Sequence, residues 1–231
     1  MLMAHPSTTI EDYLQAIYSL EGEGETVISA RLSRRMRVTP PTAWATVRRM
    51  ARDGLVTLDG KKVIHFTPKG HELAEDIVKR HRLAERFLCD VLGLGWAEAH
   101  EEAHRFEHAI TPRLEARIFA LAGNPTNCPH GSPIPGTGGR VAPDLVPLSA
   151  LTAGDEATVE FISEELEEDM DLLRYLERGK IMPGGRIRMI EAAPYSGVMI
   201  VERDGASVPL GLPVAAKIRV RKLGKATATA V

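Results

Sequence analysis

Residues 39–66 read TPPTAWATVRRMARDGLVTLDGKKVIHF, and this stretch decides the fold of the first part of the chain. The two prolines suit the first turn of a helix, and a helical pattern follows over residues 43–53. Two short strand patterns, 55–58 and 63–66, flank Asp59-Gly60, which is a hairpin signal. The stretch therefore predicts a helix followed by a two-stranded hairpin.

Two further helices are predicted before this stretch. One begins at Thr8, with Glu11 at capping-box spacing, and keeps a helical repeat of apolar residues through Leu20. The second covers residues 27–36. Three helices followed by a hairpin describe a winged helix-turn-helix, a fold that places its third helix in the major groove of DNA.

Charge is unevenly distributed along the chain. The net charge of −2 argues against a constitutive nucleic-acid binder, but residues 31–62 contain nine Lys/Arg against Asp53 and Asp59. Residues 155–171 contain nine Asp/Glu and no Lys/Arg. The chain therefore has a basic end suited to DNA and an acidic segment, and the small net charge of the whole chain conceals both.

The rest of the chain is predicted to form two more domains. Helices are expected over 67–92, 96–109 and 112–121, and residues 124–147 are a linker rich in Pro and Gly. Strand patterns at 157–162, 185–191, 198–203 and 214–220, with a helix over 170–178 and a frayed tail from Lys222, predict a small β-barrel of SH3 type. The expected domains are 1–73, 74–123 and 148–231, joined by that linker, so the fold class is mainly α with a small β part.

Composition excludes several classes of protein. The chain is 44% hydrophobic and 26% charged, and its apolar runs are too short to cross a bilayer. The first residues lack the basic and apolar regions of a signal peptide, and Cys89 and Cys128 are the only cysteines. We therefore expect a cytoplasmic protein without membrane contact.

A stripe of metal-binding residue types lies on the predicted helix over 96–109. His100, His104, Glu107 and His108 fall on one face at 3.6 residues per turn, and His81 and Glu85 share a face of the preceding helix. A single histidine on a helix is usually solvated or a core residue, but this set favours a divalent transition metal. Cys128 and His130 cannot alone complete a tetrahedral site, so that segment is predicted to be a turn.

Motifs along nearly the whole chain resemble the diphtheria toxin repressor family of metalloregulators, which has iron and manganese branches. They are TTIEDYL (8–14), MARDGLV (50–56), TPKG (67–70), HRLAERFL (81–88), Glu107-His108 and PIPG (133–136). The resemblance implies a homodimer that binds double-stranded operator DNA when loaded with Mn(II) or Fe(II) and represses metal-uptake genes. It also implies a winged helix, a helical dimerisation and metal domain, and an SH3-like domain.

The resemblance implies two metal positions. The primary one would use Asp12, His104, Glu107 and His108. The ancillary one would use His81, Glu85 and His100, joined by Glu168 and Asp171 from the C-terminal domain, although a solvated face explains those two acids equally well. Glu164, Glu165 and Glu167 are expected to be surface residues.

The chain departs from the family pattern at three places that bear on the metal. The iron branch has Met at the position of Asp12 and Cys at that of His104. The short manganese branch has Asp and commonly Glu there, and Glu where Gln15 stands. Asp12 favours Mn(II), which prefers oxygen ligands, whereas His104 favours Fe(II), Co(II) or Zn(II). We expect Mn(II), with Fe(II) as the second choice.

On the DNA side, the start of the third helix is expected to face the groove and basic residues to meet phosphates. Trp44 either contacts the groove or packs against the helices. The groove-facing residues would be Thr39, Pro41, Thr42, Ala45 and Thr46, and the phosphate contacts Arg31, Arg49, Arg52, Lys61 and Lys62.

Two other functions fit parts of the sequence. One is a winged-helix regulator that senses a small organic ligand and uses its histidines structurally. The other is a metalloenzyme, but the H-E-x-x-H pattern is missing because Arg105 follows His104. We therefore expect a metal-sensing regulator and not an enzyme.

Overall fold

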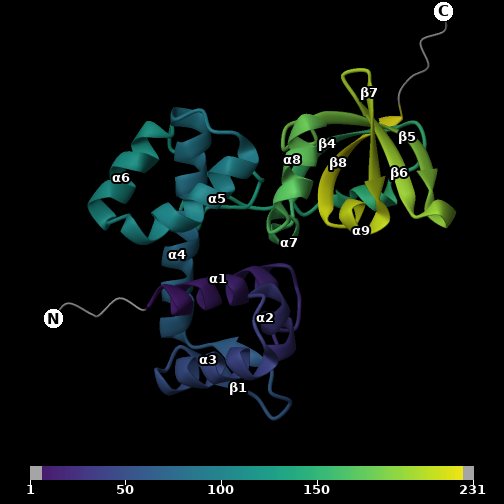
Figure 1. Cartoon of the computed structure of the whole chain (residues 1–231). Helices are drawn as coiled ribbons and strands as arrows, with labels where there is room; N and C mark the ends of the chain where they lie inside the picture. The colour runs from purple at the N-terminus through teal and green to yellow at the C-terminus, as the bar shows by residue number, and fades with distance from the viewer. Residues whose placement is uncertain (1–6, 226–231) are drawn as a thin grey trace, which may run out of the picture.

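The computed structural model describes residues 7–225, and Figure 1 shows two helical parts and a sheet domain. The first part, here called the reader, contains α1 (Thr8–Gly22), α2 (Ser29–Arg35) and α3 (Pro40–Arg52). The hairpin of β1 (Val56–Leu58) and β2 (Ile64–Phe66) follows, paired antiparallel. The apolar positions that repeat along the three helices form one buried core, which includes Leu14, Ile17, Leu32 and Val47.

Helix α4 (Pro68–Arg86) links the reader to the second part of the molecule (Figure 1). Its first half, with Ala74 and Ile77, belongs to the reader core, and its last half, with Leu83 and Ala84, belongs to a separate core. The same helix therefore sets the distance between the two parts.

The second part also contains α5 (Trp96–Phe106), the 3-10 turn η2 (Glu107–Ala109) and α6 (Pro112–Leu121). The helix expected to continue to Leu92 keeps α geometry only to Arg86, and η1 (Phe87–Val91) is a single π-helical turn. Gly93, with φ of 72°, then reverses the chain at little cost.

The C-terminal domain is a six-stranded antiparallel sheet of order β3-β8-β4-β5-β6-β7 with short helices packed against it. Trp96 of α5 is part of its apolar core, so the domain packs on α5. The sheet strands are β3 (Val146–Pro147), β4 (Asp155–Ile162), β5 (Arg186–Ala193), β6 (Val198–Arg203), β7 (Ala206–Gly211) and β8 (Ile218–Lys225), and its helices are η3 (Leu148–Ala150), α7 (Glu164–Glu167), α8 (Met170–Arg178), η4 (Pro194–Ser196) and α9 (Leu212–Ala215).

Two expectations for this domain are wrong. The segment expected as a strand over 214–220 begins inside α9, and the strand starts only at Ile218 and continues past Lys222. Strand β7 was not expected, because its sequence ASVPLG has a weak strand pattern; it lies at the sheet edge, where a proline is tolerated. The rest of the expected tail, 226–231, lies outside the described residues.

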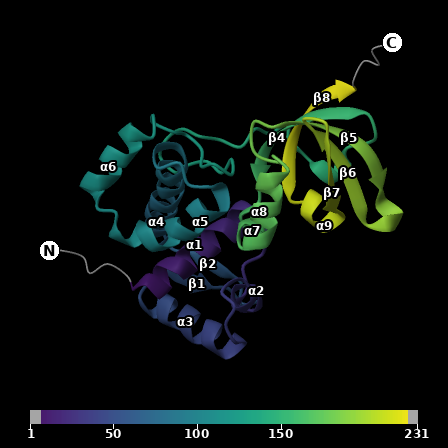
Figure 2. The ribbon, with the colours of Figure 1, turned by 45° about the horizontal axis from the view of Figure 1, so that its top comes forward.

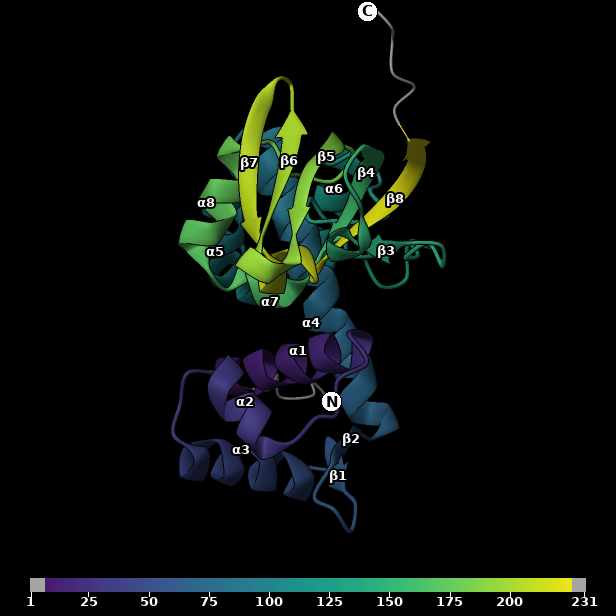
Figure 3. The ribbon, with the colours of Figure 1, turned by 90° about the vertical axis from the view of Figure 1, so that its right-hand side faces the viewer.

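The C-terminal domain touches both helical parts. Figure 2 shows α7 and α8 beside α1 and α5, and Figure 3 shows the sheet domain at the top of the view and the reader at the bottom, with α4 running from behind the sheet to the reader. Ser19 of α1 donates a hydrogen bond to Glu164 of α7, which confirms that these segments are in contact. Within residues 7–225, no helix is long and apolar enough to cross a membrane.

Candidate metal centre

The first of three clusters of metal-binding side chains joins the reader to the helical part. Its members are Asp12 of α1 and Glu107 and His108 of η2, whose ligand atoms lie within 4.8 Å of one another. Nε2 of His108 is 3.7 Å from Oδ1 of Asp12 and 3.6 Å from Oε1 of Glu107. Nδ1 of the same ring contacts Glu11 Oε2 at 2.6 Å, which holds the ring toward α1.

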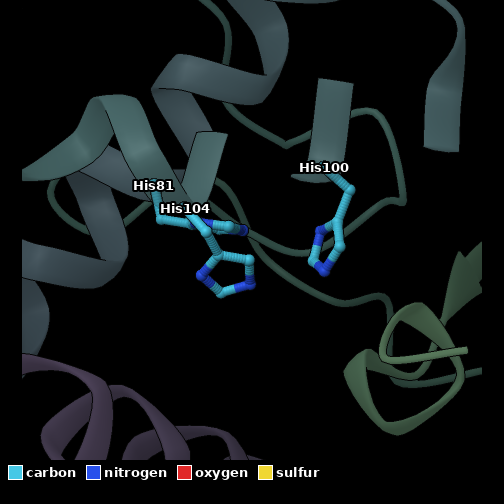
Figure 4. Close-up of side chains that lie close together, drawn as sticks. All are labelled: His81, His100 and His104. Atoms are coloured by element: carbon cyan, nitrogen blue, oxygen red, sulfur yellow. The ribbon is translucent and has the colours of Figure 1, made fainter. Parts of the chain in front are cut away.

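The second cluster consists of three histidines, His81 of α4 and His100 and His104 of α5 (Figure 4). The ring centroids of His81 and His104 are 4.5 Å apart, and those of His100 and His104 are 4.9 Å apart. His100 and His104 are four residues apart on one helix, so they share a face and meet His81 from the facing helix.

The third cluster contains Glu85, His100, His130 and Glu167, all buried. Oε1 of Glu85 lies 2.7 Å from Nδ1 of His100 and 3.2 Å from Nδ1 of His130. Oε2 of Glu167 is 3.7 Å from Nδ1 of each of these rings. Its four residues therefore come from α4, α5, the linker and α7.

Several buried ligand atoms in these clusters lack a hydrogen-bond partner among the described residues. They are Oε1 of Glu107, Oε2 of Glu85, Oε1 of Glu167 and Nε2 of His130. A buried carboxylate oxygen without a partner costs free energy, and a divalent cation would satisfy it. Mixed oxygen and imidazole donors suit Mn(II), Fe(II) or Zn(II), so the residues fit a transition metal.

Burial, together with neighbouring charges, shifts the pKa values of several cluster members. Burial, followed by the neighbouring His81 and His100, lowers the pKa of His104 to about 2, so this ring is neutral. Burial also raises the pKa of Asp12, and Glu107 and Glu11 add to that rise while His108 opposes it. Burial, Glu85 and Glu164 raise the pKa of Glu167 well above its usual range. A neutral imidazole can bind a metal without first losing a proton, and the crowded carboxylates favour a cation between them.

The structure brings most of the expected ligands together, with a different grouping. Asp12, Glu107 and His108 meet, whereas His104 lies with His81 and His100. His81 and His100 both contact Glu85, at 3.2 and 2.7 Å. A cleft of about 230 Å³ between the reader, α5 and α7 opens onto Asp12 and the three histidines of the second cluster.

The acidic segment is arranged differently from expectation. Glu168 faces Arg35, with Oε1 3.6 Å from Nε, and the side chain of Asp171 is 94% exposed and paired with Arg174. Glu167, expected at the surface, is 2% exposed. Glu164 is also largely buried, against Arg82. The expectation that Glu164 and Glu167 are surface residues is wrong because α7 packs inward against α1 and α4.

His130 was missed as a site residue. Its segment does turn, as expected, but the ring is fully buried and stacks 4.3 Å from the Trp96 ring, at an interplanar angle of 30°. Cys128 Sγ lies 3.9 Å from its Nδ1. The presence of Cys and His two residues apart was the only signal in the sequence, and it does not reveal which distant side chains face it.

The expected DNA-contacting residues form an exposed surface on α3 and the hairpin. Thr39 caps α3 by accepting a hydrogen bond from the Thr42 backbone N–H. Trp44 is half-buried against the reader core, with Lys62 Nζ 5.7 Å from its ring centroid. The exposed members of the set are Thr39, Pro41, Thr42, Ala45, Arg49, Arg52, Lys61 and Lys62, and Arg31 and Thr46 are half-buried.

Comparison with known protein families gives three matches along the chain. Residues 5–64 match the DNA-binding domain of the iron dependent repressors, and residues 67–136 match their metal binding and dimerisation domain. Residues 146–222 match the FeoA domain.

Similar proteins cover almost the whole length. The iron-dependent repressor IdeR of Mycobacterium bovis is 38% identical over 225 residues, which cover 93% of this chain and 97% of that protein. The diphtheria toxin repressor of Corynebacterium diphtheriae is 32% identical over 223 residues, 93% and 97% of the two chains. A manganese-dependent transcriptional repressor in complex with manganese superposes with a TM-score of 0.80 and 37% identity, over 93% of this chain and 100% of that one. With these matches, the chain belongs to the iron-dependent repressor family.

Proposed function

We propose that this protein is a metal-activated transcriptional repressor that binds operator DNA as a homodimer when loaded with Mn(II) or Fe(II). The observation that carries the proposal is the first cluster, in which Asp12 of the reader faces Glu107 and His108 of the helical part. A metal there ties the two parts together. The similarity to iron- and manganese-dependent repressors supports the same function.

The metal acts as a positive charge that neutralises crowded carboxylates. Without it, Glu107 and Glu11 disfavour the charged form of Asp12, and this repulsion would favour a reader that moves away from η2. A metal held by Asp12, Glu107 and His108 would shift the population toward the arrangement in which these residues meet. In a dimer that arrangement sets the spacing of the two third helices on DNA.

We assign the third cluster to a supporting metal site. Glu85, His100, His130 and Glu167 would bind that metal, and His81 lies between it and the first cluster, in contact with both Glu85 and Glu107. Glu167 takes the role first expected of Glu168 and Asp171, because Asp171 is exposed and Glu168 faces Arg35. A metal at this site would fasten the C-terminal domain to α4 and α5.

Mn(II) is the favoured metal. Asp12, Glu107, Glu85 and Glu167 supply oxygen donors, which Mn(II) prefers, and a related repressor is described as manganese-bound. The imidazoles keep Fe(II) as the second candidate. Affinity alone does not separate these metals from Zn(II), so supply in the cell contributes to the choice.

We further propose that the reader is a winged helix-turn-helix and the C-terminal domain an SH3-like barrel, with domains at 1–73, 74–123 and 148–231. The start of α3 would enter the major groove, and the basic residues of α2, α3 and the hairpin would contact phosphates. Ala45 exposes a methyl group where a polar reader is common, which favours contact with thymine methyls and readout of DNA shape. We propose that a protein with these three domains acts in the cytoplasm and regulates metal uptake.

Operator binding with and without metal tests the proposal. Affinity is measured on DNA fragments selected by the Mn(II)-loaded protein, in excess chelator and with Mn(II), Fe(II) or Zn(II) in turn. We expect at least about tenfold tighter binding with Mn(II), or about 1.4 kcal/mol, and a steep decrease with salt because phosphate contacts release counterions. Equal affinity in chelator overturns the metal sensor and leaves a regulator that responds to an organic ligand.

A further inference from the structure

One turn of the C-terminal domain is in contact with the reader at several points. Ser163 Oγ donates to Glu23 Oε1 at 2.6 Å, and Ser19 of α1 donates to the carboxylate of Glu164. Arg37 Nη2 donates to the main-chain carbonyl of Glu168 at 2.9 Å. These contacts place residues 163–168, here called the latch, against both α1 and α2.

The latch is opposite in charge to α2 and the turn that follows it. Glu168 lines a cleft of about 530 Å³ together with the arginines of α2 and of the turn that follows it, and Glu165, which also lines this cleft, pairs there with Lys217 of the C-terminal domain. Arg35 is held close to Glu168, with its side chain only 10% exposed. The acidic segment of the sequence therefore lies on part of the basic segment, and Figure 2 shows α7 next to α1 and α2.

The opposite face of the same turn belongs to the interior. Glu167 points into the third cluster, and Glu164 accepts hydrogen bonds from Arg82 Nη2 at 2.5 Å and Nε at 3.2 Å. Neighbouring residues of one turn thus contact the metal cluster, α4 and the reader. A shift of this turn moves all three contacts together, because the residues lie in α7 or directly next to it.

We propose that Glu168 is a positioning residue, which holds the reader in the arrangement that the metal requires. The latch contacts exist in the same arrangement in which Asp12 reaches Glu107 and His108. Two interactions that stabilise one arrangement strengthen each other by thermodynamic linkage, so loss of the latch must weaken metal binding at the first cluster. Glu168 does this without binding metal. The inference rests on the proposed function for its metal-dependent part.

The test compares Glu168→Gln, Arg37→Ala and their combination with a control from the same turn. Glu165→Gln is that control, because Glu165 pairs with Lys217 of its own domain. The Mn(II) concentration for half-saturation is measured without DNA. The distance between reader and C-terminal domain is measured by spin labels at Arg48→Cys and Arg178→Cys, both exposed positions, in a Cys89→Ser background.

We expect the double variant to need about fivefold more Mn(II) for half-saturation and to show a broader distribution of label distances in the metal-free protein. Glu165→Gln should match the parent in both measurements. Operator affinity at saturating Mn(II) should stay within about twofold, because the DNA surface is unchanged. The inference is overturned if the double variant has the same Mn(II) concentration for half-saturation and the same label distance as the parent. It is also overturned if Glu165→Gln changes these two quantities as much as the double variant does. If the parent itself does not bind operator more tightly with metal, the proposed function fails while the label distances still report on the latch.

Discussion

Nδ1 of His81 lies 2.5 Å from Oε2 of Glu107, and Nε2 of the same ring lies 3.2 Å from Oε1 of Glu85. One imidazole therefore connects the carboxylate of the first cluster with that of the third. Burial by itself lowers the pKa of His81, but Glu85 and Glu107 outweigh it and raise the pKa well above 6.5. Without metal, a protonated His81 supplies the positive charge between the two carboxylates.

This contact predicts competition between metal and proton. A cation bound by Glu85 or Glu107 would repel the protonated ring of His81 and favour loss of its proton, so apparent Mn(II) affinity should rise with pH through neutrality and level off above the raised pKa of the ring. His104 adds nothing to this slope, because its pKa of about 2 leaves it neutral throughout. Calorimetric titration with Mn(II) in buffers of different protonation enthalpy should detect release of a proton. His81→Gln should make the Mn(II) affinity less dependent on pH. A dependence of Mn(II) affinity on pH that is unchanged by His81→Gln would show that His81 is not the group that releases the proton.

Glu107 and His108 should be essential for the response to metal. Glu107→Gln or His108→Ala removes a ligand of the first cluster, so Mn(II) should no longer tighten operator binding, while the dimer stays folded. His81→Ala should only weaken the response, because its ring supports the site from the second cluster. Operator titrations at increasing Mn(II), with circular dichroism as the folding control, decide this. A normal response of Glu107→Gln removes Glu107 from the primary site.

Substitutions in the third cluster and at the exposed acid of α8 should differ in their effect on the number of metals bound per chain. Glu167→Gln should lower the number of metals bound per chain or the affinity of the weaker site, because Glu167 is buried beside Glu85 and the rings of His100 and His130. Asp171→Asn should change neither, because that side chain is 94% exposed and contacts Arg174. Metal analysis after equilibrium dialysis measures both variants. A loss of metal in Asp171→Asn alone would restore the assignment first expected from sequence.

Glu164 should make the metal-free protein sensitive to acid. Burial alone would raise its pKa, but Arg82 and Ser19 lower it from 4.5 to about 2. A lowered folded-state pKa gives stability that is complete above 4.5 and is lost as pH decreases toward about 2. Glu164→Gln should cost on the order of 3 kcal/mol at neutral pH, since it leaves the buried Arg82 without its partner. Urea unfolding in chelator should show this difference shrinking below pH 4.5, and a pH-independent difference would argue against the ion pair.

Gly70 should be indispensable for packing of α4 on the hairpin. A Cβ at this position would lie 1.8 Å from the Leu55 carbonyl oxygen, which is backbone and cannot move aside easily. Gly70→Ala should therefore destabilise the protein by about 1–3 kcal/mol in thermal unfolding. Gly60→Ala, where nothing lies within 4 Å of the added Cβ, is the matched control and should be nearly neutral. Equal stability of the two variants would mean that the reader shifts to admit the methyl group.

Sequence periodicity was sufficient to predict the helices and the hairpin of the reader. The expected helices over 8–20, 27–36 and 43–53 correspond to α1, α2 and α3 within a few residues, and Asp59-Gly60 lies between the two short strands. These features depend on neighbours in the chain, such as caps, prolines and the helical repeat of apolar residues. The concentration of histidine and glutamate over 100–108 is equally local, so a metal site could be expected before any contact was known.

The grouping of the ligands was decided by the tertiary structure. On an ideal helix His104 shares a stripe with Glu107 and His108, but α5 ends at Phe106 and the next residues form a 3-10 turn. Such a turn has about three residues per turn, which rotates Glu107 and His108 away from His104. His130 and Glu167 lie far along the chain from Glu85, and they reach it because the C-terminal domain packs on α5 through Trp96. Local sequence determined which residues could bind a metal, and packing between domains determined which of them face one another, because that choice depends on apolar contacts between distant segments.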